Sequence, residues 1–225
     1  MNYNRLFIVH VPRYGVLLYL ALTAISILLY AGGTINDPDT VGYSFTRNFF
    51  SDLGKFTPRN FLSMIFFAGS LCVTGITFNF YFYNFMKYYN NDSLGIMAKI
   101  GSFLGMVGAL CFAGVGLTPH NVLGDLHIIF VNWAFRSFLI SSILFTIVLY
   151  KDVRFQNHYA IGYCMFAVSI FLYIMVLEFG PDAKSSDLSL IFNVLTQKAI
   201  ILIFMLSVLF QSFGNSKLAA NNSLK

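Results

Sequence analysis

Polar and ionisable side chains gather in three short segments of an otherwise apolar chain. The first segment reads NFFSDLGKF over residues 48–56, where a Ser-Asp pair followed by a glycine is typical of a tight turn. The second reads GLTPHNVLGDLH over residues 116–127, and the third reads LEFGPDAKSSD over residues 177–187. These segments and two isolated cations supply groups that bind polar ligands or transfer protons. The candidate site residues are Asn48, Ser51, Asp52, His120, Asp125, His127, Arg136, Glu178 and Lys198.

Binding of an anionic amphiphile is the first chemistry open to this set. Arg and Lys side chains suit phosphate, so Arg136 and Lys198 point to a phospholipid or another lipid with an anionic head. A structural role is the alternative. In that case Glu178 or Asp52 would neutralise Arg136. Asp182 would then pair with Lys198 across a short loop.

Catalysis is the second chemistry. An acceptable set of zinc ligands is present in Asp52, His120, Asp125 and His127. The sequence lacks the HxxxH and HExxH spacings that mark many zinc enzymes. Ser51 could serve as a nucleophile with His120 or His127 as its base, although no G-x-S-x-G context surrounds it. The sequence therefore leaves open whether the protein is an enzyme.

Six long apolar runs must position these side chains. Of the 225 residues, 57% are hydrophobic and 10% are charged, well below the ~25% charged residues of soluble domains. About 20 apolar residues cross the bilayer as a helix, and a lone strand could not satisfy its backbone there. We expect the first run to be a retained helix, since it is longer than a signal-peptide core. The predicted spans are 14–33, 61–85, 97–117, 126–150, 158–179 and 188–212.

The distribution of Lys and Arg predicts the orientation. Eight lie in the terminal segments and even-numbered loops, and four lie in the odd-numbered loops. The positive-inside rule therefore places both termini in the cytoplasm. All three polar segments then face the extracytoplasmic side. Because the second and third segments are short, we expect their side chains to stay at one mouth of the bundle.

Two cations are predicted to lie deep in the membrane. Arg136 and Lys198 are each ten residues into their spans, or ~15 Å from the surface. An ionised group at that depth needs a partner or a wet cavity. Asp125, Asn132 and Arg136 share one helix face, which we expect to point inward, with His127 on the opposite side. Arg136 would then provide a buried positive charge beneath the Ser51-Asp52 turn.

Other ligand classes find little support in the sequence. No Gly-rich phosphate loop or basic run occurs, so neither a nucleotide nor a nucleic acid is expected. The four histidines are divided between the two sides of the membrane, which argues against a bis-histidine haem. Cys72, Cys111 and Cys164 lie in apolar runs and are predicted to be small buried side chains. We therefore expect no cofactor.

Two of the quoted segments resemble a known family. NFFSDLG and GVGLTPHNVLGDLH are similar to motifs of the small prokaryotic membrane proteins classed as domain of unknown function 998. In that family an Asn precedes a Ser-(Asp/Glu)-Leu-Gly turn, and a Gly-x-x-Pro stretch, an acid and a His open the fourth helix. The residues that match are Asn48, Ser51, Asp52, Leu53, Gly54, Gly116, Pro119, Asp125 and His127.

The resemblance covers roughly residues 14–212, and Lys198 stands where the family usually has a basic residue. His120 and Asn121 follow Pro119 at the place where the family usually has an acid. The resemblance implies a six-helix membrane fold without an established activity. A weaker likeness to the DRAM/Frag/Sfk-type six-helix proteins implies a connection with lipids.

The sequence thus predicts an all-α bundle of six transmembrane helices that forms a single integral membrane domain over residues 1–225. We expect it in the plasma membrane, with membrane lipids as partners and homo-oligomerisation left open. The favoured function is binding or modulation of a lipid or other anionic amphiphile at a polar extracytoplasmic site. The alternative is a membrane-embedded hydrolase, metal-dependent or not, that acts at the outer leaflet. A small transporter is the third choice.

Overall fold

The computed structural model describes residues 5–222 and confirms the all-α, multi-pass architecture. Within this range, six helices are long and apolar enough to cross a membrane. An isolated antiparallel β-bridge joins Gly32 and Val41. A π-helical turn (Leu6–His10) leads into the first of them. The six are α2 (Val11–Leu29), α3 (Phe61–Phe85), α4 (Ser93–Leu117), α5 (Gly124–Lys151), α6 (Asn157–Phe179) and α7 (Asp187–Asn222).

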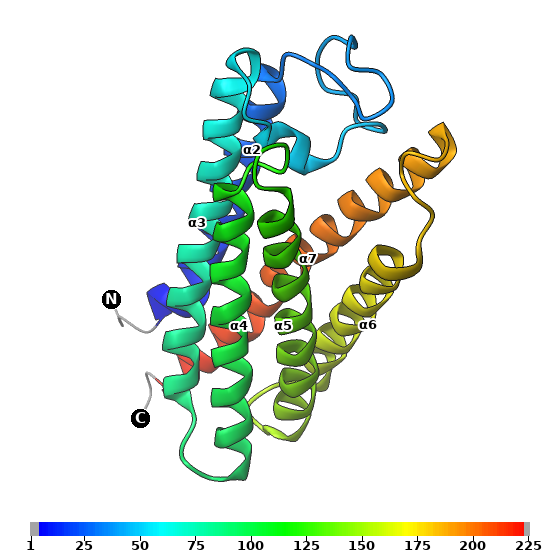
Figure 1. Ribbon diagram of the computed structural model, residues 1–225. Coiled ribbons are helices and arrows are strands. Elements are labelled where there is room, and N and C mark those ends of the chain that lie inside the picture. Colours follow the sequence, from blue (N-terminus) through cyan, green and yellow to red (C-terminus); the bar gives the residue numbers. More distant parts are fainter. Residues whose placement is uncertain (1–4, 223–225) are drawn as a thin grey trace.

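The helices form a ring in chain order. Each packs against the next one along the chain, and α7 closes the ring against α2. The helices α3, α4 and α5 stand side by side, whereas α7 runs obliquely across the bundle (Figure 1). Figure 1 also shows the long segment between α2 and α3 at the end of the bundle far from the chain termini. That segment, residues 30–60, is called loop one below.

The helix ends follow local capping signals more closely than hydropathy alone. The second predicted span coincides with α3, and Thr57 accepts a hydrogen bond from the Asn60 N–H at 3.3 Å, which opens the short turn Pro58–Asn60 before it. The first helix ends at Leu29, earlier than predicted, because Tyr30 is extended and Gly32 and Gly33 have positive φ angles.

The last helix runs ten residues beyond the predicted end at 212 and reaches Asn222. Its polar end stays helical because it packs on the bundle. Asn215 donates to the Ile8 carbonyl at 3.2 Å and to the Tyr81 hydroxyl at 3.1 Å, and Leu218 is fully buried. The Arg13 guanidinium donates to Ser212 Oγ at 2.8 Å. These contacts place the two ends of the described chain on the same face of the bundle.

Aromatic side chains fill most of the core, and glycines let the helices approach one another. Phe78, Phe138 and Phe204 pack edge to face, with ring centroids 5.0–6.3 Å apart. A Cβ on Gly105 would lie 2.5 Å from the Phe82 ring of α3, so this glycine is required by packing. A smaller apolar cluster that includes Tyr19, Leu53, Phe67, Leu71 and Val115 lies under loop one.

The cysteines depart from their prediction. All three are free thiols, but Cys72 and Cys111 are half-buried and Cys164 is exposed. The prediction of buried side chains is therefore wrong for Cys164. Its helix is apolar on every side, and the exposed side of a spanning helix meets lipid, where a small weakly polar side chain is tolerated.

Candidate functional site

The Ser-Asp segment folds as the predicted turn, and Asp52 closes it. Residues Phe50–Gly54 form a 3₁₀ turn in which the Phe49 N–H donates to Asp52 Oδ2 at 2.9 Å and the Asp52 N–H donates to the Phe49 carbonyl at 3.2 Å. A Cβ on Gly54 would lie 2.8 Å from the Phe67 ring, so the turn rests directly on α3. The local sequence therefore fixes the position of the Asp52 carboxylate.

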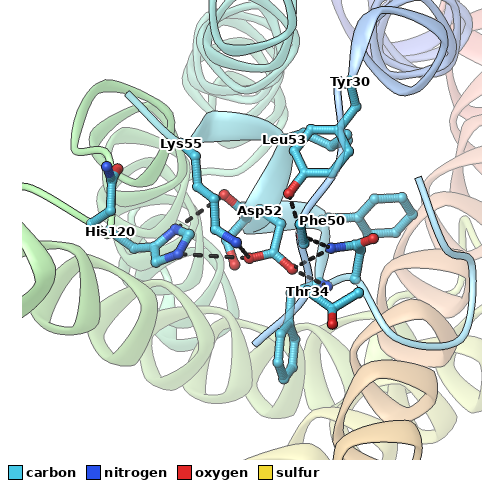
Figure 2. Close-up of polar contacts among 12 residues, drawn as sticks. Tyr30, Thr34, Phe50, Asp52, Leu53, Lys55 and His120 are labelled. Atoms are coloured by element: carbon cyan, nitrogen blue, oxygen red, sulfur yellow. Dashed lines mark hydrogen bonds and ion pairs between the residues drawn. The ribbon is translucent and has the colours of Figure 1, made fainter. Parts of the chain in front are cut away.

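The Asp52 carboxylate is buried and bound from several directions. Only 1% of the residue is exposed. Asn48 Nδ2 donates to Oδ2 at 3.1 Å, while Lys55 Nζ and His120 Nε2 lie 3.0 and 3.6 Å from Oδ1. Figure 2 shows Lys55 and His120 approaching this carboxylate, one from its own turn and the other from the segment before α5. Such a carboxylate organises its surroundings and leaves little of its surface for a ligand.

The segment between α4 and α5 holds loop one through His120 and Asn121. His120 Nδ1 lies 3.2 Å from the Ser51 carbonyl, so it donates a hydrogen bond when that nitrogen is protonated. Asn121 accepts from the Phe56 N–H at 2.9 Å and donates to the Phe56 carbonyl at 3.1 Å. Burial lowers the pKa of His120 below its ordinary value, and the negative charge of Asp52 offsets part of this effect.

The last helix holds loop one from the other side. Lys198 Nζ donates to the Asn48 carbonyl at 2.6 Å, and the rings of Tyr43, Phe45 and Phe50 surround it with centroids 5.1–5.3 Å away. Lys198 is only 7% exposed, so the ammonium exchanges water for one carbonyl and three aromatic faces. Gln197, which precedes Lys198 on α7, accepts a hydrogen bond from the Phe50 N–H through its side-chain oxygen at 2.8 Å.

A cavity lies beneath this tethered loop. Its volume is about 60 Å³. The side chains of Ser51, His127 and Gln197 and the hydroxyl-bearing rings of Tyr19 and Tyr173 line it among apolar ones. The His127 ring is fixed, because its Nδ1 lies 2.7 Å from the Thr118 carbonyl and only 7% of the residue is exposed. His120 and His127 also face each other, with ring centroids 5.9 Å apart. We call this cavity the chamber.

The structure brings together six of the nine predicted site residues. Asn48, Ser51, Asp52, His120 and Lys198 meet in loop one and its attachments, and His127 lies directly below. This gathering includes Lys198, which the sequence placed near the bilayer centre with Asp182 as its partner. That pairing is wrong, because Lys198 donates to loop one whereas the Asp182 side chain accepts from the Lys184 N–H at 3.0 Å in its own turn.

Arg136, Glu178 and Asp125 lie elsewhere. Arg136 forms an ion pair with Glu178 of α6, and both side chains are about 40% exposed (40% and 41%). The structural alternative considered for this pair is therefore confirmed, and the expected buried charge beneath the turn is absent from the chamber lining. Asp125 is exposed at the first turn of α5. The prediction that the face of α5 with Asp125 and Arg136 points inward is therefore wrong, because His127 lies on the buried face.

The catalytic alternatives gain no geometric support. Among residues 5–222 no group of three or more His, Cys, Asp or Glu side chains is arranged to hold a metal ion. The His120 ring nitrogens face the main-chain carbonyl of Ser51 and the Asp52 carboxylate. The Ser51 hydroxyl is therefore not the atom to which this imidazole is bound, as a serine nucleophile would require.

Sequence reasoning missed three residues of the site. Lys55 completes the ion pair with Asp52, and its position three residues later in the same turn could have revealed it. Gln197 precedes Lys198 in the TQKAII stretch, where an amide in an apolar helix is the available signal. Tyr43 had no signal, because it reaches Lys198 only through the path of loop one.

Comparisons of this chain with protein-family models, with curated proteins and with solved structures give no match. The resemblance described above therefore rests on the quoted residues and on the six-helix architecture, and it stays a prediction.

Proposed function

We propose that this integral membrane protein binds a membrane lipid whose polar head sits in the chamber and whose acyl chain follows the core of the bundle. The proposal depends on how polar and apolar side chains are distributed around this cavity. Ser51, His127 and Gln197 line its end at loop one, and Tyr19, Leu71, Phe112 and Ile201 are among the residues around the rest. A space that is polar at one end and apolar at the other suits an amphiphile.

The apolar end of the chamber continues into two further cavities. Tyr19, Leu71, Phe112 and Ile201 also line a cavity of about 30 Å³. That cavity shares Phe78 and Phe204 with a third one of about 40 Å³. The three spaces thus share side chains as walls. Rotation of a few of these side chains would join them into one row.

The row is long enough for one acyl chain. It follows α7 from Gln197 to Gln211, which corresponds to ~21 Å at the helical rise per residue. One leaflet of a bilayer, whose thickness is set by its acyl chains, is ~15 Å thick. Three narrow cavities in line fit a single flexible hydrocarbon chain better than a compact solute.

The chamber lining favours a head that forms hydrogen bonds. Its polar groups are the Ser51 hydroxyl, the His127 imidazole, the Gln197 amide and the phenol hydroxyls of Tyr19 and Tyr173, none of which carries a fixed charge. The two cations expected to bind an anionic head are engaged elsewhere, Arg136 by Glu178 and Lys198 by the Asn48 carbonyl. An ester or a hydroxyl-bearing head is therefore the favoured class, and an anionic head is the second candidate that the experiment compares.

Two neighbouring residues of α7 provide the test. Ile201 lines the chamber and the next cavity, whereas Leu202 is 54% exposed on the outside. We compare Ile201→Phe with Leu202→Phe in phosphatidylcholine vesicles that contain a monoacylglycerol or a fatty acid with a diazirine in its acyl chain. Photolabelling should fall strongly in Ile201→Phe and stay at the wild-type level in Leu202→Phe.

Thermal unfolding shows whether both variants keep the fold. Equal labelling of two folded variants would refute the proposal. The difference between the two probes decides the charge of the head, because both carry the same type of chain.

The finer localisation is also a proposal. The excess of Lys and Arg in the terminal segments and the even-numbered loops supports cytoplasmic ends and an extracytoplasmic loop one, and the plasma membrane is the proposed location. Reporter fusions after residue 90 and after residue 183 test this orientation, with activity of a cytoplasmic reporter expected only at the first position. Reporter activity only after residue 183 would place loop one and the chamber on the cytoplasmic side instead.

A further inference from the structure

We infer that the groove between α6 and α7 is a second lipid site, through which the acyl chain of a bilayer lipid reaches the chamber from the side. The groove has a volume of about 180 Å³ and is lined mainly by apolar residues, among them Leu172, Val176, Ala199 and Ile203. This inference rests on the proposed lipid binding and names the source of the ligand as the surrounding membrane.

Tyr173 forms the partition between the groove and the chamber. It is the residue that lines both spaces. Its ring packs edge to face on Phe135, a chamber residue, with centroids 4.7 Å apart, and the residue is 7% exposed. Displacement of this one shared side chain would open a connection between the two spaces.

The hydrocarbon that surrounds the groove indicates which kind of ligand binds there. The flanking apolar side chains are exposed, with Leu172 58% and Leu202 54% accessible, and both lie within membrane-spanning helices. Two hydroxyls on the groove wall are satisfied within their own helices, Ser169 by the Met165 carbonyl and Thr196 by the Phe192 carbonyl, each at 2.9 Å. An apolar groove that opens toward hydrocarbon suits an acyl chain.

The two helices are held most closely at the end far from the groove. Gln211 Nε2 donates to the Tyr159 carbonyl at 2.8 Å. A Cβ on Gly162 would lie 2.7 Å from the Phe210 ring, so the helices touch closely there. Both contacts lie more than two turns along α7 from Ala199, toward the chain termini. The helices can therefore separate at the groove while this contact acts as a pivot.

Ala199→Trp tests the inference with Leu202→Trp as its control. Ala199 is exposed and lines the groove but not the chamber, and Leu202 lies on the same helix outside both. The diazirine-bearing monoacylglycerol is mixed with the protein in phosphatidylcholine vesicles and is photolysed after increasing delays. Adducts on Met205, a residue of the second cavity, report arrival of the chain.

We expect labelling of Met205 to become about tenfold slower in Ala199→Trp, with the same final extent, because the indole fills the groove. Leu202→Trp should label as fast as the wild type. Equal rates in the two variants would overturn the lateral route while leaving lipid binding intact. Failure of both the monoacylglycerol and the diazirine-bearing fatty acid to label the wild-type protein would instead overturn the proposed function itself.

Discussion

Replacement of Asp52 by Ala should detach loop one from the rest of the protein. The carboxylate accepts hydrogen bonds from Asn48 Nδ2 and the Phe49 N–H, forms an ion pair with Lys55, and lies 3.6 Å from His120 Nε2. Removing one partner from a buried ion pair costs about 3–5 kcal/mol. The Lys55 side chain is 19% exposed and can turn toward water, so the lower end of that range, about 3 kcal/mol, is expected.

For a chain of this size the loss corresponds to a fall in melting temperature of about 6–12 °C. Circular dichroism of the detergent-solubilised protein during heating measures it. Asp39→Ala is the matched control, because Asp39 belongs to the same loop, carries the same charge and is exposed. Its effect should stay within about 0.5 kcal/mol.

Asp52→Asn should fall between these two variants, since the amide keeps one oxygen that can accept from the Phe49 N–H. A melting temperature for Asp52→Ala equal to that of Asp39→Ala would refute the reasoning. It would mean that the contacts of Asp52 contribute nothing to the attachment of loop one.

Two further predictions concern the groups on either side of loop one. Lys198→Met removes the donor to the Asn48 carbonyl, an interaction of about 1.5–3 kcal/mol for a charged donor, so trypsin should cleave faster after Arg47; an unchanged cleavage rate would contradict the tether. Because burial lowers the pKa of His120, the folded protein binds fewer protons than the unfolded chain, and stability should fall as pH drops below about 6.5. His120→Gln should flatten that dependence in a pH series of melting curves, and identical curves for variant and wild type would count against it.

The architecture followed from the sequence because crossing a membrane demands long apolar helices. Both the number and the type of the elements were predicted, and α3 was placed correctly because Thr57 and Pro58 mark its start. The end of α7 was predicted ten residues too early. Hydropathy detects only the part of a helix that contacts lipid, and α7 continues beyond that part along the bundle. Packing around Asn215 and Leu218 decides that end.

The direction in which each helix faces was harder to predict. In α5 both the lipid-facing and the core-facing sides are apolar, with Trp133 exposed and Phe138 buried, so periodicity does not separate them. The spacing of Asp125 and Arg136 therefore did not show which face of α5 points into the bundle. Arg136 instead pairs with Glu178 on a neighbouring helix.

The gathering of Asn48, Asp52 and His120 was predictable because the loops that carry them are close to the helix ends. The role of Lys198 was not. It depends on the oblique course of α7 (Figure 1). It also depends on the path of loop one, which brings the Asn48 carbonyl to Lys198, and both features are results of tertiary packing.

We propose that an acyl chain occupies the core of this bundle. Mapping the photoadducts of the diazirine-bearing monoacylglycerol by mass spectrometry tests it most directly. We expect adducts on Leu71, Phe112 and Met205, of which Leu71 and Phe112 are at most 7% exposed. Adducts confined to outward-facing residues such as Leu110 and Leu202, which are 62% and 54% exposed, would contradict it.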